Sequence, residues 1–335
     1  MGTMDEDSNN RSLIRAGADE IEQMSGVTHS APVLITAAGS TAKFAWEEFV
    51  YGRLRNPGTR RAYLFAVRRF LNWCSDLGVE LNRIAPAHVG RYMDELTYAP
   101  ATKKLQLAAL RHFFDELVLR HVVVLNPAAA VRSQRLQVIE GKTPEITVKQ
   151  CRTLLTSIDI GTVVGLRDRA VISVLIYTAA RVGAIAKLRR RDFYDVGDQY
   201  CLRLTEKGTK LREIPVRHDL RGFLLEYIEA ARLENSVSDS PFFRTTIRRT
   251  KTFTAIGMNT GDISRMVKRR LADAGLSRAF SPHSFRVCTV TDLLHQGVPL
   301  ADVQMLAGHA DPRTTRLYDR RHRQVTRNIV ERISV

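Results

Sequence analysis

A polar break divides the apolar pattern of this 335-residue chain into two parts. A long helical pattern ends at Asn126-Pro127, and the stretch QRLQVIEGKTPEIT after it contains Gly141 and Pro144. Glycine and proline interrupt regular structure, and domain boundaries commonly fall in such polar stretches. Because 335 residues exceed what a single hydrophobic core usually holds, we expect two cores, one on each side of the break.

The pattern predicts four segments. Residues 1–40 contain six acidic and two basic side chains and are predicted to form a flexible acidic tail. Residues 41–135 are predicted to be a helical domain, 136–146 a linker, and 147–335 a second domain that ends in a helix. The helical domain carries 15 basic and 8 acidic side chains, so its net charge is positive.

Apolar spacing predicts a mainly α fold with a small antiparallel β-sheet. In TRRAYLFAVRRFLNWCSDLG and ATKKLQLAALRHFFDELVLRH, apolar residues recur at spacings of three and four, as on one face of a helix. RDRAVISVLIYTAARVGAIAKL is predicted to be one helix. In FYDVGDQYCLRLTEKGTKLREIPV, apolar and polar residues alternate in stretches separated by polar breaks, which predicts about three antiparallel strands. The rest of the second domain is predicted to be helical.

The charge of the chain points to a polyanionic partner. The formal net charge is +16 and the pI is about 10.1, which favours nucleic acid. The chain contains no run of 18 apolar residues, so no membrane span is predicted. Its acidic start lacks the features of a secretory signal. The four cysteines lie far apart without CxxC or zinc spacing, so we expect a reduced, cytoplasmic protein with no metal and no cofactor.

The segment SPHSFR contains a candidate phosphate site. Ser281 is a favoured N-cap, so His283 and Arg286 share one face of the first helical turn. The free amides and the dipole of a helix N-terminus attract an anion. A second His-x-x-Arg, at His218 and Arg221, follows a predicted strand directly and is interpreted as the start of a surface helix.

A third group of polar residues lies near the C-terminus. Gly308 ends a predicted short helix, which places His309 on a turn between two helices. The next helix carries RTTRLYDRR, with Tyr318 among arginines. A phenol has a pKa near 10 and is a weak nucleophile unless cationic surroundings favour the phenolate. In such surroundings its oxygen could attack phosphorus; the alternative is ordinary amphipathic packing.

Taken together, these segments resemble the catalytic domain of the tyrosine recombinase (phage integrase) family over residues 170–320. TAARVGAIAKLRRRDF is similar to the first-arginine box, and EKGTKLREIPV to the β-hairpin that bears the catalytic lysine. SPHSFR is similar to the His-x-x-Arg box, and LAGHADPRTTRLYDR to the last box. These matches place the family's catalytic residues, in order, at Arg181, Lys207, His283, Arg286, His309 and Tyr318. Residues 41–135 resemble the family's helical, SAM-like core-binding domain.

The resemblance implies a reaction. Arg181 and Arg286 would hold the non-bridging oxygens of a scissile phosphate, and His309 would donate a third hydrogen bond. Tyr318 would attack to give a 3′-phosphotyrosine, with neither ATP nor a metal ion.

The proton donor and acceptor are less closely defined. Lys207 would protonate the leaving 5′ oxygen, and Lys210 is the competing candidate. His283 would accept the phenol proton or hold the phosphate. The family usually has an acid three residues after the first arginine, where this chain has Ala184, and often His-Thr after the second, where it has Val287-Cys288.

The resemblance predicts a site-specific recombinase or integrase, encoded by a mobile genetic element, that acts as a homotetramer on two double-stranded DNA attachment sites. Accessory DNA-bending proteins are candidate partners, and the expected location is the bacterial cytoplasm, at the nucleoid. A type IB topoisomerase-like enzyme, a catalytically weak DNA-binding regulator and an RNA-packaging protein are the alternatives. Four cations near helix starts in the first domain are candidate DNA contacts, with solvated faces as the alternative: Arg60, Arg61, Lys103 and Lys104.

Overall fold

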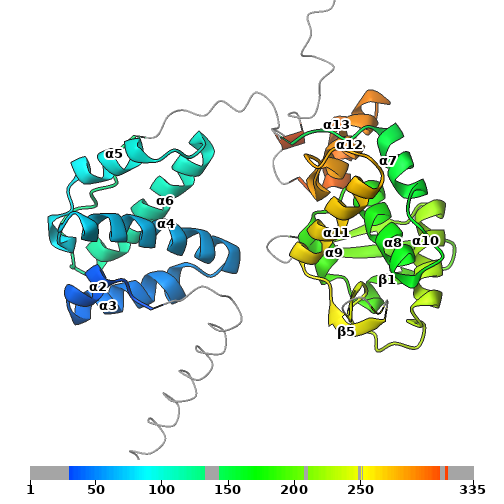
Figure 1. Ribbon diagram of the computed structural model, residues 1–335, viewed down its shortest axis with the longest axis horizontal. Coiled ribbons are helices and arrows are strands. Elements are labelled where there is room, and N and C mark those ends of the chain that lie inside the picture. Colours follow the sequence, from blue (N-terminus) through cyan, green and yellow to red (C-terminus); the bar gives the residue numbers. More distant parts are fainter. Residues whose placement is uncertain are drawn as a thin grey trace, which may run out of the picture. The chain divides into compact units, whose positions relative to one another are not determined.

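The computed structural model of the protein describes residues 30–132, 143–206, 210–247, 250, 252–309 and 314–315. The chain divides between residues 137 and 138 into two compact units, each with its own buried core (Figure 1). Among the described residues, none of the helices is both long and apolar enough to cross a membrane.

The first unit is helical. Its α-helices are α2 (Val33–Ala37), α3 (Ser40–Glu47), α4 (Pro57–Asp76), α5 (Pro86–Glu95) and α6 (Pro100–Leu119), with a π-helical turn at Glu48–Arg53 and a 3₁₀ turn at Leu81–Arg83. Helix α4 begins where the sequence favours a start, because the Asn56 side chain accepts hydrogen bonds from the amides of Gly58 and Thr59. Helix α2 lies before residue 41, the predicted start of this domain, and its Ile35 is buried in the same core.

Aromatic side chains form the centre of the first unit. Trp46, Phe49 and Phe113 are fully buried, and their rings meet at centroid distances of 5.4 to 6.1 Å. These distances are typical of tilted and edge-to-face aromatic pairs. The apolar faces of α4 and α6 pack on this cluster, which accounts for the three- and four-residue spacing of their sequences.

The second unit is helical around two small antiparallel sheets. Its elements are α7 (Val148–Thr156), α8 (Val163–Thr178), α9 (Val182–Lys187), a 3₁₀ turn (Arg190–Asp192), β1 (Phe193–Asp195), β2 (Tyr200–Thr205), β3 (Leu211–Pro215), α10 (His218–Ala230), β4 (Arg244–Thr246), β5 (Phe253–Gly257), α11 (Thr260–Asp273), α12 (Pro282–His295) and α13 (Leu300–Ala307). Strands β1, β2 and β3 pair in sequence order, with Leu202 opposite Phe193 and Ile214. The predicted fold class, mainly α with a small antiparallel sheet, is confirmed.

Helix α8 is the central element of the second unit. Its C-terminal half is apolar on all sides, and Val171, Ile172, Val174 and Leu175 are fully buried. A helical segment without a polar face belongs inside a core, and α7, α10, α11 and α12 all contact α8.

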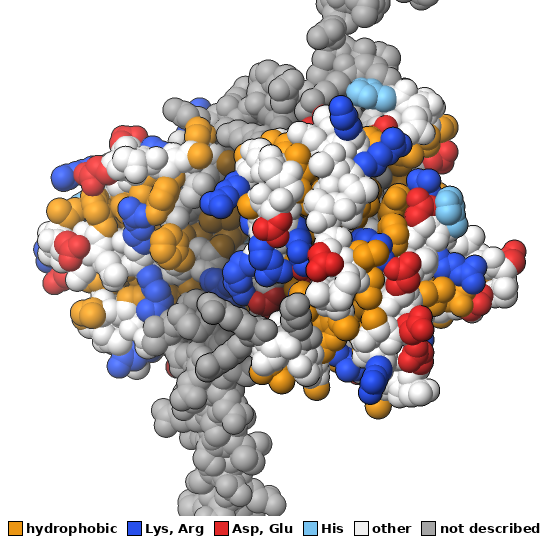
Figure 2. Space-filling model, turned by 45° about the vertical axis from the view of Figure 1, so that its right-hand side comes forward, with side chains coloured by type: hydrophobic (Ala, Val, Ile, Leu, Met, Phe, Trp, Pro, Cys, Tyr) orange, Lys and Arg blue, Asp and Glu red, His pale blue; other side chains and the backbone are white. Residues whose placement is uncertain are grey.

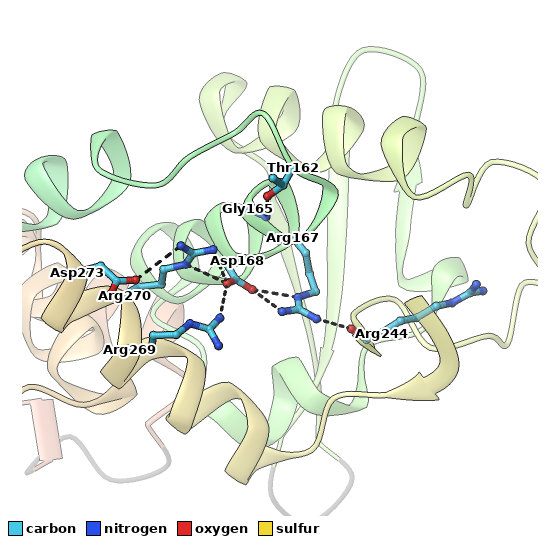
Figure 3. A network of polar contacts seen from close by, with 8 residues as sticks. All are labelled: Thr162, Gly165, Arg167, Asp168, Arg244, Arg269, Arg270 and Asp273. Atoms are coloured by element: carbon cyan, nitrogen blue, oxygen red, sulfur yellow. Dashed lines mark hydrogen bonds and ion pairs between the residues drawn. The ribbon is translucent and has the colours of Figure 1, made fainter. Parts of the chain in front are cut away.

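A buried carboxylate links α8 to α11 (Figure 3). Asp168 has no exposed surface, and it accepts hydrogen bonds from Arg167 at 2.7 and 3.0 Å. Arg269 and Arg270 of α11 each donate to its other oxygen at 2.9 Å. Arg167 also donates to the carbonyl of Arg244 in β4, so one network joins two helices and a strand.

Two predictions of local structure are wrong. The helix predicted over RDRAVISVLIYTAARVGAIAKL is broken after Thr178, because Ala179 takes a left-handed backbone conformation with φ 49°. Strands β4 and β5 form a hairpin in a region predicted to be helical. The Thr245 and Thr254 hydroxyls lie 2.6 Å apart across this hairpin, and such threonine pairs are typical of antiparallel strands.

Candidate active site

Arg181 is positioned by the break between α8 and α9. The two carbonyls at the end of α8 are capped from elsewhere in the fold: Arg212 of β3 donates to Thr178, and Arg286 of α12 donates to Ala179 at 2.5 Å. The last carbonyls of a helix need such donors, and cations are favoured at that end. The chain can therefore turn there, and Arg181 becomes the N-cap residue of the short helix α9 instead of lying inside a long helix.

The His-x-x-Arg pair lies on the first turn of α12, as predicted. The helix starts after Ser281, whose amide donates to the Ser284 hydroxyl at 3.1 Å. Arg286 is almost wholly buried, whereas His283 is exposed. Desolvation, followed by the charges of Arg286 and Arg181, lowers the pKa of His283. The lowered pKa favours the neutral form of His283, which can accept a proton.

His309 follows α13 and is buried. The helix ends at Gly308 in the left-handed conformation, with φ 62°, which a glycine adopts without strain. The Nδ1 atom of His309 lies 2.8 Å from the Thr315 hydroxyl oxygen. Desolvation is the largest cause that lowers its pKa to about 4, and the charges of Arg286 and Arg181 add to it. His309 therefore lies close enough to both arginines for their charges to affect its pKa.

Glu206 and Arg212 complete the described part of the site, and sequence reasoning assigned a role to neither. Glu206, directly after β2, accepts a hydrogen bond from Arg181 at 2.8 Å and another from Arg212 at 2.9 Å. Burial raises the pKa of Glu206, but the hydrogen bond from Arg181 and the charge of Arg212 outweigh it, so the pKa is lowered. The available sequence signal was an acid directly before the predicted catalytic lysine.

The structure thus brings together four of the six predicted catalytic residues: Arg181, His283, Arg286 and His309. The other two, Lys207 and Tyr318, lie outside the described residues, as does the predicted C-terminal helix. Lys210, the alternative to Lys207, is exposed, and its carbonyl accepts a hydrogen bond from the Glu206 amide at 2.8 Å.

The second His-x-x-Arg lies at the start of α10, on the surface, as the sequence predicted. The His218 side chain is 84% exposed and contacts its neighbour Asp219 at 2.7 Å. The Arg221 guanidinium lies over the ring of Tyr200, 4.4 Å from its centroid. Neither residue joins the described site.

The four candidate DNA contacts of the first unit differ in exposure and in their hydrogen bonds. Arg60 donates to the carbonyl of Leu54, and Lys103 donates to the carbonyl of Met93. Arg61 and Lys104 are exposed. Lys and Arg side chains are spread over the visible face of the molecule among hydrophobic and acidic ones (Figure 2).

A groove of about 1170 Å³ lies between α4 and α6 in the first unit. Arg61, Arg68 and Arg69 line it together with the exposed side chains of Phe65 and Leu105. The predicted contact Arg61 thus belongs to a larger basic and apolar surface. Arg68 and Arg69 extend that surface beyond the four residues named from the sequence.

Acidification is expected to destabilise the second unit through His309. Its folded pKa of about 4 is below the unfolded value of 6.5, so between these values the unfolded chain binds more protons. The contribution of neutral His309 to the free energy of unfolding is fully present above pH 6.5. It is lost as the pH falls towards 4, by up to about 1.4 kcal/mol per pH unit. Urea unfolding at pH 7 and pH 5 measures it.

The variant His309→Asn should lose part of this pH dependence. The exposed His218→Asn is the matched control and should retain it. If His309→Asn and the unmodified chain lose equal stability on acidification, His309 is not a source of the pH dependence.

Comparison with known proteins adds the family context. Residues 144–324 match the model of the phage integrase family, and residues 47–121 match that of the phage integrase N-terminal SAM-like domain. The tyrosine recombinase XerD of Xanthomonas campestris pv. campestris is 31% identical over 237 residues, which cover 68% of this chain and 70% of that protein. XerD of Chlorobaculum tepidum is 26% identical over 278 residues, covering 78% and 84%.

Solved structures share the fold. The XerH site-specific recombinase bound to a palindromic difH substrate, in a post-cleavage complex, matches with a TM-score of 0.66 at 18% identity, covering 89% of each chain. A lambda integrase dimer bound to a COC′ core site matches with a TM-score of 0.61 at 18% identity, covering 97% of this chain and 90% of the other.

Proposed function

This chain belongs to the phage integrase family of tyrosine site-specific recombinases, and we propose that it cuts and rejoins DNA through a phosphotyrosine. The observation that supports this most is the clustering of Arg181, Arg286 and His309. They come from three separate segments, and both arginines act electrostatically on the buried His309. Two guanidiniums beside neutral imidazoles suit a phosphodiester, whose negative charge must be neutralised during transfer.

The two arginines hold the scissile phosphate. Each guanidinium carries five N–H donors; Arg181 donates to the Glu206 carboxylate, and Arg286 donates to the carbonyl of Ala179. The planar fork of a guanidinium suits the bidentate geometry of two non-bridging phosphate oxygens. Burial of Arg286 strengthens this electrostatic contact, because less water screens it.

The histidines divide the remaining tasks. If the Thr315 hydroxyl donates to Nδ1, the neutral ring of His309 keeps its proton on Nε2 and can donate it to a phosphate oxygen. His283 is exposed and has a lowered pKa, which favours its role as acceptor of the phenol proton over that of phosphate ligand. Tyr318 forms the bond to phosphorus while the bond to the 5′ oxygen breaks, and rejoining reverses both steps.

Replacement of Lys207 by alanine is expected to slow cleavage of ordinary DNA about 10²-fold or more, because it removes the acid that protonates the leaving 5′ oxygen. DNA with a 5′-thio leaving group needs no such acid, since a thiolate leaves readily, and should be cleaved at nearly the unmodified rate. Single-turnover cleavage of both substrates provides the measurement. Lys210→Ala is the matched variant; if it shows this pattern instead, Lys210 is the acid.

The partner is double-stranded DNA that carries attachment sites, and the assembly is a homotetramer on two sites. Arg61 and Lys104 are the preferred backbone contacts of the first unit, because they are exposed. Arg60 and Lys103 keep their role as additional contacts. We place the protein in the bacterial cytoplasm, at the nucleoid, and encoded by a mobile element.

A covalent capture experiment tests the function. The attachment site is first selected from a random-sequence duplex pool by repeated binding, and the full chain is then incubated with that site carrying a nick. A protein–DNA adduct on a denaturing gel is the expected result, and its absence would overturn the proposal. Exchange of strands between two such sites distinguishes recombination from topoisomerase-like relaxation, which needs only one site.

A further inference from the structure

Glu206 lies between two arginines of the site. It follows β2 and directly precedes Lys207 in the sequence, and its side chain is only 5% exposed. One carboxylate oxygen accepts a hydrogen bond from Arg181, and the other accepts one from Arg212. Both oxygens are therefore engaged, each by a guanidinium.

Arg181 needs a partner of this kind. Its side chain is 41% exposed, and a long exposed arginine samples many rotamers unless a contact fixes it. Residue 184, on the same short helix, is a buried alanine whose methyl group cannot accept a hydrogen bond. Among the described residues, Glu206 is the acid with an ion pair to Arg181.

Arg212 fixes Glu206 in turn. The Arg212 side chain is 9% exposed and donates to the carbonyls of Thr178, at 3.1 Å, and of Leu306. A Cβ atom at Gly308 would lie 3.3 Å from its Nε atom, so α13 ends close against this guanidinium. Arg212 therefore ties the carboxylate to the end of α8 and to the segment that carries His309.

We infer that Glu206 is a positioning residue for Arg181, which supplies from the β2–β3 hairpin the acid that the chain lacks at Ala184. This inference rests on the proposed function, since it concerns how Arg181 is held for the scissile phosphate. It also links strands β2 and β3 to the first arginine, through Glu206 and Arg212. A merely structural ion pair would stabilise the hairpin without changing the reaction at Arg181.

The first test is Glu206→Gln, which keeps the shape and removes the charge. We expect adduct formation on the nicked duplex to slow about 10- to 100-fold, in the range of couplings between contacting residues. DNA affinity in a gel-shift assay should change little, whereas the urea midpoint should fall, because the buried Arg212 loses its counter-charge; the rate is therefore measured without urea, where the variant is folded. The matched control is Glu213→Gln, an exposed glutamate of β3 that pairs with Arg203 at 2.9 Å; it should stay within about twofold of the unmodified rate.

A double-mutant cycle separates positioning from structure. In an Arg181→Ala background, Glu206→Gln should cause no further slowing, because the group that it positions is gone. A full additional loss in that background, or an unmodified rate for Glu206→Gln alone, would overturn the inference.

Relocation of the acid provides a further readout. Ala184→Glu combined with Glu206→Gln should recover part of the lost rate if the acid can act from α9. Because residue 184 is buried, the recovery is read only if the urea midpoint shows that this variant folds; otherwise the cycle alone decides. If the proposed function fails, the unmodified chain forms no adduct; if only the inference fails, it forms one and Glu206→Gln matches it.

Discussion

Replacement of Tyr318 by phenylalanine is expected to abolish the covalent adduct, with a loss on the order of 10⁴-fold or more. The change removes one oxygen, the atom that we propose bonds to phosphorus, and leaves the ring in place. A phenol has a pKa near 10, so attack at neutral pH requires cations that favour the phenolate and a base that accepts its proton. In the proposed mechanism, Arg181 and Arg286 are these cations and His283 is the base. Denaturing gels of the nicked-duplex reaction provide the measurement.

DNA binding should survive the Tyr318→Phe change, since the phosphate ligands remain. Tyr194→Phe is the matched control, because its hydroxyl belongs to the same unit and contacts Arg203 at 3.4 Å on the hairpin. It should form the adduct at nearly the unmodified rate. An adduct that persists in Tyr318→Phe would assign the nucleophile to another residue.

Replacement of Asp168 by alanine is expected to destabilise the second unit by about 3 to 5 kcal/mol. The buried carboxylate pairs with three arginines, two of which, Arg167 and Arg270, have side chains only 5% and 16% exposed (Figure 3). Without it, Arg167 stays buried without its carboxylate, and Arg270 keeps only the longer contact to Asp273 at 3.8 Å. This costs far more than the loss of one surface ion pair. Urea unfolding, followed through the transition of the second unit, provides the measurement.

Asp239→Ala is the control for this second prediction. Asp239 pairs with Arg191 at 3.0 Å, but both side chains are more than half exposed, so water replaces the lost contact. Its urea midpoint should stay nearly unchanged. A shift of less than 1 kcal/mol in Asp168→Ala would show that the arginines find other partners or solvent.

Much of the fold could be predicted from local pattern. The apolar spacing of α4 and α6, the N-cap at Ser281 and the alternation around β2 and β3 depend on neighbours within a few residues, so the sequence displays them directly. The end of α8 could not be predicted in this way. Thr178 and Ala179 continue an apolar helical pattern, and the donors that cap their carbonyls come from β3 and α12.

Part of the candidate site could likewise be predicted from the sequence, and part could not. The order and spacing of Arg181, His283, Arg286 and His309 predicted which residues meet, and the structure brings these four together in one site. The resemblance also predicted Lys207 and Tyr318, which remain predictions for the experiments above. It did not predict Glu206, because an acid in a turn looks like any solvated surface residue until the fold places it.

The sequence by itself determined the family, the two-core organisation and the chemical types at the site, because residue identity, periodicity and spacing are properties of the chain. Only the tertiary structure decided which groups face each other and how strongly water is excluded from them. The packing of α9 against β2 brings Glu206 to Arg181, 25 positions away in the chain, and burial lowers the pKa of His309 to about 4. Such contacts and pKa shifts depend on distance and desolvation in the folded state, which no local pattern contains.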